Sequence, residues 1–259
     1  METQNTKIKI KIRRGIPSIG SWIMIGNIAS AEILSSIDFE WIVVDMEHTA
    51  VGYETLQLLL LAIKSRGKSA LVRIENNDEV VIKRVLDCGA DGIIVPQIQS
   101  GKEAEMAVKS AKYPPEGSRG IAIGRASGYG NNFDSYFNTF NDDVIIFVQI
   151  EHYKAVEDIE SIVSVKGLDG VFLGPYDLSG SMGIVAQFDH PKMREARARV
   201  IKAARKANIA LGIHEVAGDI NSVLARIDEG FNFIACGIDT VFLTKAAKDF
   251  YNQIKENIH

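Results

Sequence analysis

Short apolar segments rich in β-branched residues alternate along the whole chain with longer segments of helical periodicity. Most of the short segments are continuous apolar runs, as expected for parallel strands that are covered on both faces. The predicted strands are residues 18–25, 41–45, 70–74, 92–96, 144–151, 170–174, 210–214 and 233–237. The predicted helices are residues 29–36, 54–65, 78–88, 102–111, 156–163, 192–207, 220–229 and 241–254. Strict alternation of strand and helix predicts a parallel sheet.

Eight strands in 259 residues favour a closed TIM (β/α)8 barrel over an open doubly wound sheet. A dinucleotide-binding fold would carry a GxGxxG motif directly after its first strand, and none follows residues 18–25. No Walker motif and no Pro/Gly-rich linker interrupts the alternation. The sequence therefore predicts one α/β barrel domain over residues 1–259, with residues 1–17 as an N-terminal arm.

The composition limits the partners that we expect. Hydrophobic residues make up 46% and charged residues 24%, which is enough to bury a large core. The net charge of −4 implies no broad basic surface, so we expect no nucleic-acid partner. No apolar run is long enough to span a bilayer, and no signal-peptide pattern opens the chain. We therefore expect no membrane partner and a cytoplasmic location, with Cys88 and Cys236 as reduced thiols.

Two segments stand outside the regular pattern. Residues 7–14 alternate Lys with Ile (KIKIKIRR), which we interpret as a short amphipathic arm or edge strand, packed on a neighbouring subunit. Residues 113–142 form a long stretch rich in Gly, Asn and Tyr. A loop of that length in a compact fold is functional, lid-like or locally structured.

Polar residues gather at the predicted C-terminal ends of the strands, where barrel enzymes carry their active sites. Closure of the barrel would bring these groups onto one rim. They are Asp45, Glu47 and His48 after the second strand, Arg73 at the third, Gln149 and Glu151 at the fifth, Tyr176 and Asp177 after the sixth, and Asp239 after the eighth.

The acidic residues Glu151 and Asp177 are the candidate metal ligands. Two carboxylates on one rim repel each other unless a proton or a cation separates them. Ligands that offer only oxygen suit Mg²⁺ or Mn²⁺, with Co²⁺ or Zn²⁺ as alternatives. In the purely structural interpretation, each carboxylate caps a loop or pairs with an arginine.

His48 and Arg73 are the candidate groups for proton transfer and anion binding. A carboxylate that hydrogen-bonds one imidazole nitrogen fixes the tautomer and leaves the other nitrogen free for proton transfer. Asp45 and Glu47 both have suitable spacing for this role beside His48, and the alternative is a solvent-exposed loop histidine. Arg73 at the end of an apolar strand needs an anion, which is either a structural carboxylate or a substrate carboxylate or enolate.

Two rival chemistries are disfavoured. No predicted strand ends in lysine, so a Schiff-base aldolase lacks its nucleophile. No GxSxG motif occurs, so a serine hydrolase lacks its nucleophile elbow.

Six stretches together resemble one known family, the HpcH/HpaI aldolases, which are metal-dependent class II pyruvate aldolases. The resemblance runs from about residue 18 to the C-terminal helix, and the order D-x-E-H, V-R, Q-x-E, G-P-x-D-L-S is specific. The stretches are residues 39–50 (FEWIVVDMEHTA), 70–78 (ALVRIENND), 82–98 (IKRVLDCGADGIIVPQI), 113–130 (YPPEGSRGIAIGRASGYG), 148–152 (VQIEH) and 168–183 (LDGVFLGPYDLSGSMG).

The resemblance implies a role for each matching residue. Glu151 and Asp177 would hold the divalent metal, and His48 would act as acid and base, oriented by Asp45. Further implied contacts with the pyruvate moiety come from Arg73, Gln149 and the backbone near Gly174 and Tyr176.

The resemblance also implies an assembly and a reaction. The family barrel exchanges its last helix between neighbours, commonly in a hexamer built from dimers, so we expect a homo-oligomer. We expect cleavage or formation of 4-hydroxy-2-oxo acids through a pyruvate enolate with an aldehyde partner. The family pattern GPADLS has a small residue where this chain has Tyr176, which leaves the acceptor open. The alternatives are a citrate-synthase-like enzyme that joins or splits acyl-CoA and a 2-oxo acid, and a non-catalytic metabolite-binding barrel.

Overall fold

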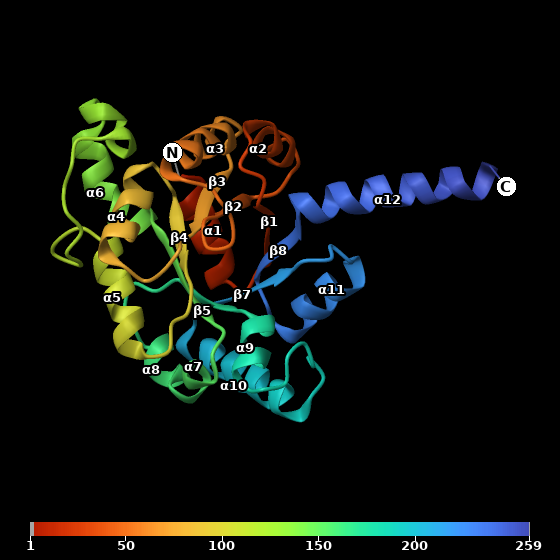
Figure 1. The fold of residues 1–259 in the computed structure, drawn as a ribbon. Coiled ribbons are helices and arrows are strands. Elements are labelled where there is room, and N and C mark those ends of the chain that lie inside the picture. The colour runs from red at the N-terminus through yellow and green to blue at the C-terminus, as the bar shows by residue number, and fades with distance from the viewer. Residues whose placement is uncertain (1–2, 259) are drawn as a thin grey trace.

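Eight parallel strands close into a barrel in chain order in the computed structural model, which describes residues 3–258 (Figure 1). Each strand pairs with the next along the chain, and the last returns to the first. The strands are β1 (Ser18–Ile23), β2 (Trp41–Asp45), β3 (Ser69–Arg73), β4 (Gly92–Val95), β5 (Ile145–Ile150), β6 (Gly170–Leu173), β7 (Ala210–Glu215) and β8 (Phe233–Ile238). The predicted TIM barrel is confirmed, and each predicted strand agrees with the observed one to within two residues.

Helices surround the barrel on its outside (Figure 1). Those that follow the predicted pattern are α2 (Ile28–Ser35), α3 (Tyr53–Ser65), α4 (Glu79–Asp87), α5 (Gly101–Ala111), α10 (Pro191–Ala207), α11 (Ile220–Glu229) and α12 (Asp239–Ile258). The helix predicted at residues 156–163 is instead two short helices, α7 (Tyr153–Glu157) and α8 (Ile159–Val163). The sequence pattern did not reveal α1 (Gln4–Arg13), the 3₁₀ helix η1 (Arg125–Gly130), α6 (Phe133–Asp143) and α9 (Pro175–Ser181). The segment 113–142 thus contains local structure, which is one of the alternatives expected for it.

Stacked aromatic rings fill the middle of the barrel. The ring of Phe233 lies 3.9 Å from that of Trp41 and 4.3 Å from that of Phe147, centroid to centroid. Glycines on adjacent strands leave room for these rings, because a Cβ on Gly20 would lie 2.2 Å from Trp41 and one on Gly170 would lie 2.3 Å from Phe147. The middle of the barrel is therefore a packed core.

The helix α1 corrects our interpretation of residues 7–14 as an edge strand. Ile8 and Ile12, one helical turn apart, are 0% and 3% exposed and pack with the aromatic residues of the barrel interior. Between them, Lys9 donates to the Asp142 carbonyl at 2.6 Å and lies 3.3 Å from the carboxylate of Asp169. The apolar interior and a buried acid at the N-terminal end of the barrel thus favour a helix with one buried face over a strand whose side chains alternate between two faces.

The helix α12 leaves the body of the barrel and projects away from it (Figure 1). Several of its apolar side chains are exposed, namely Leu243, Phe250, Tyr251 and Ile258. Among the helices of residues 3–258, none combines the length and the apolar character that crossing a bilayer would demand. Cys88 and Cys236 are both free thiols, as expected.

Candidate active site

A cavity of about 250 Å³ opens at the C-terminal ends of the strands. Eight of the ten residues singled out from the sequence line it, although they come from four separate stretches of chain. They are Asp45, His48, Arg73, Gln149, Glu151, Gly174, Tyr176 and Asp177. Glu47 contacts Arg73 without lining the cavity. Asp239 instead accepts hydrogen bonds from the backbone of Met24 and Ile25. The structure therefore brings the predicted site residues together around one space.

An ion pair between Asp45 and Arg73 forms one side of the cavity. The register of β2 and β3 places these two residues directly beside each other. The Nε of Arg73 donates to Asp45 Oδ1 at 3.0 Å, and its Nη2 donates to Asp45 Oδ2. Burial acts to raise the pKa of Asp45, but the hydrogen bonds and the charge of Arg73 outweigh it and hold that pKa below its ordinary value.

The guanidinium of Arg73 keeps donors that Asp45 does not use. Its Nη1 lies 3.2 Å from Glu47 Oε2, while a guanidinium carries five N–H groups in all. The indole of Trp22 lies beneath it at 5.1 Å and donates its own N–H to Asp45 Oδ2 at 3.3 Å. Arg73 is thus held at a fixed angle with N–H groups left for a ligand. The sequence analysis missed Trp22, whose polar ring edge near the end of β1 was the available signal.

The imidazole of His48 lies near Glu47 rather than Asp45. Its Nε2 is 3.7 Å from Glu47 Oε2, and 56% of its side chain is exposed. Asp45 Oδ1 instead accepts hydrogen bonds from the backbone N–H groups of Glu47 at 3.0 Å and His48 at 3.3 Å. The expectation that Asp45 orients the ring is therefore corrected, since Asp45 holds the backbone of the loop that carries the ring.

Glu151 is buried at the back of the cavity with only 2% of its surface exposed. Its Oε1 accepts from the Gln97 backbone N–H at 2.7 Å, and its Oε2 accepts from Gln149 Nε2 at 2.8 Å. Burial, together with the charges of Glu47 and Asp177, raises the pKa of Glu151 to about 7. A side chain at Gly174 would block this arrangement, because its Cβ would lie 2.7 Å from Glu151 Oε2.

Asp177 faces the same cavity from the first turn of α9, which follows directly after β6. It is exposed, unlike Glu151, and its negative charge acts on both Glu151 and Glu47. The two predicted metal ligands therefore line the same cavity. Glu151 is buried, and Asp177 is exposed.

The donor set fits a hard divalent cation. The carboxyl groups of Asp45, Glu151 and Asp177 line the cavity together with one guanidinium, that of Arg73. A fourth carboxyl group, that of Glu47, lies beside Arg73 at 3.2 Å. The buried Oε1 of Gln149 has no hydrogen-bond partner within residues 3–258. The same range holds no cluster of three or more His, Cys, Asp or Glu side chains of metal-site form, so water or substrate oxygens would complete the shell of an ion held here.

Tyr176 lies at the mouth of the cavity. It is 58% exposed, and its ring packs edge-on against Phe188 at 4.9 Å. The position that carries a small residue in the pattern GPADLS therefore carries an aromatic ring here, which packs against Phe188.

His214 is a cavity residue that the sequence analysis missed. Its ring stacks on Trp22 at 4.6 Å, and its Nε2 donates to the Gly237 carbonyl at 3.0 Å. Burial lowers the pKa of His214 to about 4, so the ring is neutral near pH 7. The signal was available, because His214 is the last residue of the strand predicted at 210–214.

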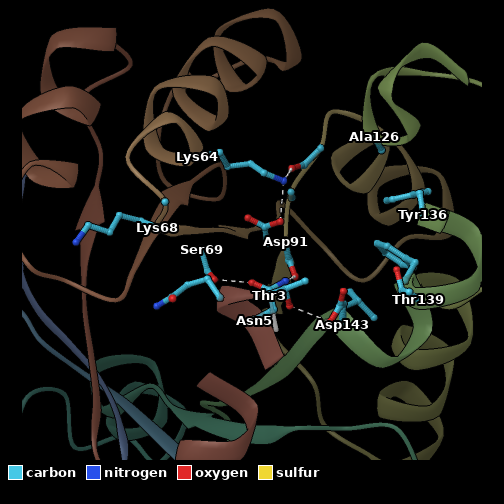
Figure 2. Close-up of a pocket in the computed structure, with 16 residues that line it drawn as sticks. Thr3, Asn5, Lys64, Lys68, Ser69, Asp91, Ala126, Tyr136, Thr139 and Asp143 are labelled. Carbon is cyan, nitrogen blue, oxygen red and sulfur yellow. Dashed lines mark hydrogen bonds and ion pairs between the residues drawn. The ribbon is translucent and has the colours of Figure 1, made fainter. Parts of the chain in front are cut away.

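A second cavity, of about 310 Å³, opens elsewhere, between α1, α3 and α6 (Figure 2). Its polar groups are matched to one another. Lys64 Nζ lies 2.7 Å from Asp91 Oδ1, and Thr3 Oγ1 donates to Asp143 Oδ1 at 3.0 Å (Figure 2). This cavity lies between the N-terminal segment and the barrel, and none of the predicted site residues line it.

Comparison with known proteins identifies the family that the sequence resembles. The family model for HpcH/HpaI aldolase/citrate lyase matches residues 18–246. The chain is 38% identical over 244 residues to a 4-hydroxy-2-oxo-heptane-1,7-dioate aldolase of Salmonella dublin, covering 93% of this chain and 91% of that one. It is 34% identical over 262 residues to a hydroxypyruvate/pyruvate aldolase of Paraburkholderia phytofirmans, covering 98% and 100%.

Solved structures agree with this assignment. The crystal structure of an HpcH/HpaI aldolase/citrate lyase family protein from Burkholderia cenocepacia superposes with a TM-score of 0.91 at 30% identity, covering 96% of this chain and 99% of that one. An HpcH/HpaI aldolase from Desulfitobacterium hafniense superposes with a TM-score of 0.87 at 32% identity, covering 96% of each chain. The barrel topology and the order of acidic and basic residues along its rim agree with these relatives. The chain therefore belongs to the HpcH/HpaI aldolase/citrate lyase family and is a carbon–carbon lyase.

Proposed function

We propose that this protein is a divalent-metal-dependent class II aldolase that cleaves or forms 4-hydroxy-2-oxo acids through the enolate of pyruvate. The observation that carries the proposal is the excess of acidic groups over basic ones at the cavity, where Asp45, Glu151 and Asp177 line the space with one guanidinium, that of Arg73, and Glu47 lies beside it. Such a site favours a cation and, beside it, a small anionic ligand. The relatives named as 4-hydroxy-2-oxo acid and pyruvate aldolases support the same substrate class.

Glu151 and Asp177 are the residues that would hold the metal ion, with Mg²⁺ or Mn²⁺ the best match to oxygen ligands. When bound, the ion would supply Lewis acidity to the developing negative charge, an effect that contributes several kcal/mol in such enzymes. Glu151 is already held in place by Gln97 and Gln149, so binding would require little rearrangement of its side chain.

Arg73 binds and orients the keto acid. Asp45 and Trp22 fix its guanidinium, and its unused N–H groups then act on the carboxylate or the enolate oxygen of the substrate. Gln149, whose Oε1 has no partner among residues 3–258, offers one more polar contact at the same depth.

His48 moves the proton at the mouth of the cavity. Its exposed imidazole lies beside Glu47, where it can accept the proton of the 4-hydroxyl group as the carbon–carbon bond breaks. In the reverse direction the same nitrogen returns the proton to the aldehyde oxygen. Such proton transfer contributes about 10²- to 10⁴-fold to rate.

The exposed apolar side chains of α12 support a homo-oligomer as part of this proposal. A helix that projects from its barrel without covering these side chains suits exchange with a neighbouring copy, in a dimer or in a hexamer built from dimers.

The first test concerns the metal. The protein is dialysed against EDTA, and pyruvate release from a 4-hydroxy-2-oxo acid is assayed before and after Mg²⁺ or Mn²⁺ is restored. We expect turnover to need the added ion. We expect Glu151→Ala and Asp177→Ala to lower kcat/KM by about 10³-fold or more, because a hard cation loses a charged ligand. Among alanine variants of the residues that would act on the substrate, we expect Arg73→Ala to lower the rate most.

The control is Glu160→Gln, which removes a carboxylate that pairs with Arg199 on the outside of the barrel. Mn²⁺ binding, measured by calorimetry, should be lost with the two ligand variants and kept in the control. Undiminished turnover after EDTA dialysis would contradict the metal assignment. Condensation of acetyl-CoA with oxaloacetate, in place of pyruvate with aldehydes, would favour the citrate-synthase-like alternative.

A further inference from the structure

The two sides of the cavity differ in character. Beside the acidic and basic groups described above, the remaining wall is built mainly from apolar side chains, namely Trp22, Met24, Phe172, Val216 and Ile238. His214 is the one residue of that wall whose ring carries a hydrogen-bond acceptor. The mechanism proposed above gives it no role.

The hydrogen bond to Gly237 determines which ring nitrogen of His214 carries the proton. A carbonyl oxygen only accepts, so the Nε2 that lies 3.0 Å from it must carry the hydrogen. In the neutral ring, Nδ1 is then an acceptor whose lone pair the hydrogen bond to Gly237 leaves free. Burial keeps the ring neutral by lowering its pKa to about 4.

The ring is also fixed in position. It stacks on Trp22 with an interplanar angle of 18°, and Trp22 in turn contacts the Asp45–Arg73 pair. The acceptor is therefore held at a constant place relative to the guanidinium that binds the keto acid. A fixed acceptor in an apolar wall favours a ligand that brings a donor to it and disfavours one that leaves it unpaired.

We propose that His214 is a specificity-determining residue whose Nδ1 accepts a hydrogen bond from an aliphatic hydroxyl of the substrate. This inference rests on the proposed function, because the hydroxyl belongs either to the 2-oxo acid or to the aldehyde of that reaction. The shared chemistry is one alcohol group on a carbon next to a carbonyl.

Two substrate pairs that differ by a single hydroxyl test the proposal. The donor pair is hydroxypyruvate against pyruvate, each with propanal, and the acceptor pair is glycolaldehyde against acetaldehyde, each with pyruvate. The quantity compared is the ratio of kcat/KM for the hydroxylated over the deoxygenated member. The arm in which this ratio depends on His214 identifies the source of the hydroxyl.

Two variants separate recognition from structure. His214→Phe keeps a flat ring for Trp22 and removes the acceptor, while His214→Asn keeps a polar atom near the Nδ1 position. Both lose the hydrogen bond to Gly237, so they form a matched pair. We expect the ratio to fall about 3- to 10-fold in His214→Phe, the value of one neutral hydrogen bond, and to be retained in His214→Asn.

An unchanged ratio in His214→Phe for both pairs, or an equal fall in both variants, would overturn the proposal. If the wild type with Mn²⁺ turns over no pair, the proposed function fails, and calorimetry then decides the role of His214. A hydroxypyruvate preference over pyruvate in Kd that is lost in His214→Phe supports it. Equal affinities, or no binding of either acid, overturn it.

Discussion

Single side chains at the rim owe their chemistry to a few short contacts. Arg73 is held by Asp45 and Glu47, and it lies over Trp22, so its direction is set before any ligand arrives. Glu151 accepts hydrogen bonds from Gln97 and Gln149, yet its pKa still rises to about 7 because burial and neighbouring carboxylates dominate. Arg73 thus offers a preorganised positive charge beside an acidic group whose charged form is disfavoured by burial.

The lowered pKa of His214 predicts how stability depends on pH. The folded ring binds a proton only near pH 4, whereas the unfolded ring binds one near pH 6.5, so acid favours unfolding across that window. Its contribution is fully present above pH 6.5 and falls by about 2 kcal/mol at pH 5. Urea unfolding of the wild type and His214→Phe at pH 7.5 and pH 5 measures this. We expect the stability advantage of the wild type to shrink by that amount at the lower pH, and a constant difference would refute it.

Most of the rim residues were predictable because strand ends in a parallel barrel all meet at one edge. Asp45, Arg73, Glu151 and Asp177 follow from that rule alone. The partner of the His48 ring did not follow, because Asp45 and Glu47 have equally suitable spacing and the loop conformation decides between them. His214 also ends a predicted strand, so the same rule applies to it, but a histidine buried against Trp22 is not distinguished by sequence from one that only packs in the core.

At the level of elements, the strands were predictable and the N-terminal helix was not. A continuous apolar run between two helices indicates a buried strand whatever its neighbours are. The alternation of Lys and Ile in residues 7–14 suits a strand equally well, and only the buried Asp169 and the open end of the barrel select the helix. The helix α9 is too short to show any periodicity in the sequence.

The pair of Lys9 and Asp169 gives an expected stability change at this scale. Burial lowers the pKa of Lys9 and raises that of Asp169, so each charge depends on the other. Asp169→Asn leaves Lys9 buried without its partner, and we expect the free energy of unfolding to fall by about 3–5 kcal/mol. Urea denaturation followed by circular dichroism measures it. The pair of Asp38 and Lys68, in which Asp38 is fully exposed, provides the control, since Asp38→Asn should change stability little.

At the level of the whole molecule, the barrel accounts for all of the chain described except the outer part of α12, which extends into solvent (Figure 1). A single sequence shows that this helix is amphipathic, but it cannot show which surface covers its apolar face. In our proposal that surface belongs to another copy of the protein. The pattern of residues in one chain therefore does not predict it.

Charge introduced on α12 tests the assembly. Phe250 is 66% exposed in the single chain, so Phe250→Glu should leave the barrel fold intact while it disrupts an interface. We expect the wild type to sediment as a dimer or larger oligomer and the variant as a smaller species with an unchanged circular dichroism spectrum. Lys248→Glu on the same helix is the control. A monomeric wild type, or a variant of unchanged mass, would count against an exchanged helix.

The way in which α1 closes the barrel has a consequence for how the chain folds during synthesis. The side-chain amide of Asn232 donates to the Ile12 carbonyl at 2.7 Å, across 220 positions of sequence. The helix α1 thus has binding partners among residues that are synthesised long after it, and β1 must likewise wait for β8. Ile8 and Ile12 therefore remain without their native cover until β8 has been synthesised, which makes this segment a point of contact for a chaperone.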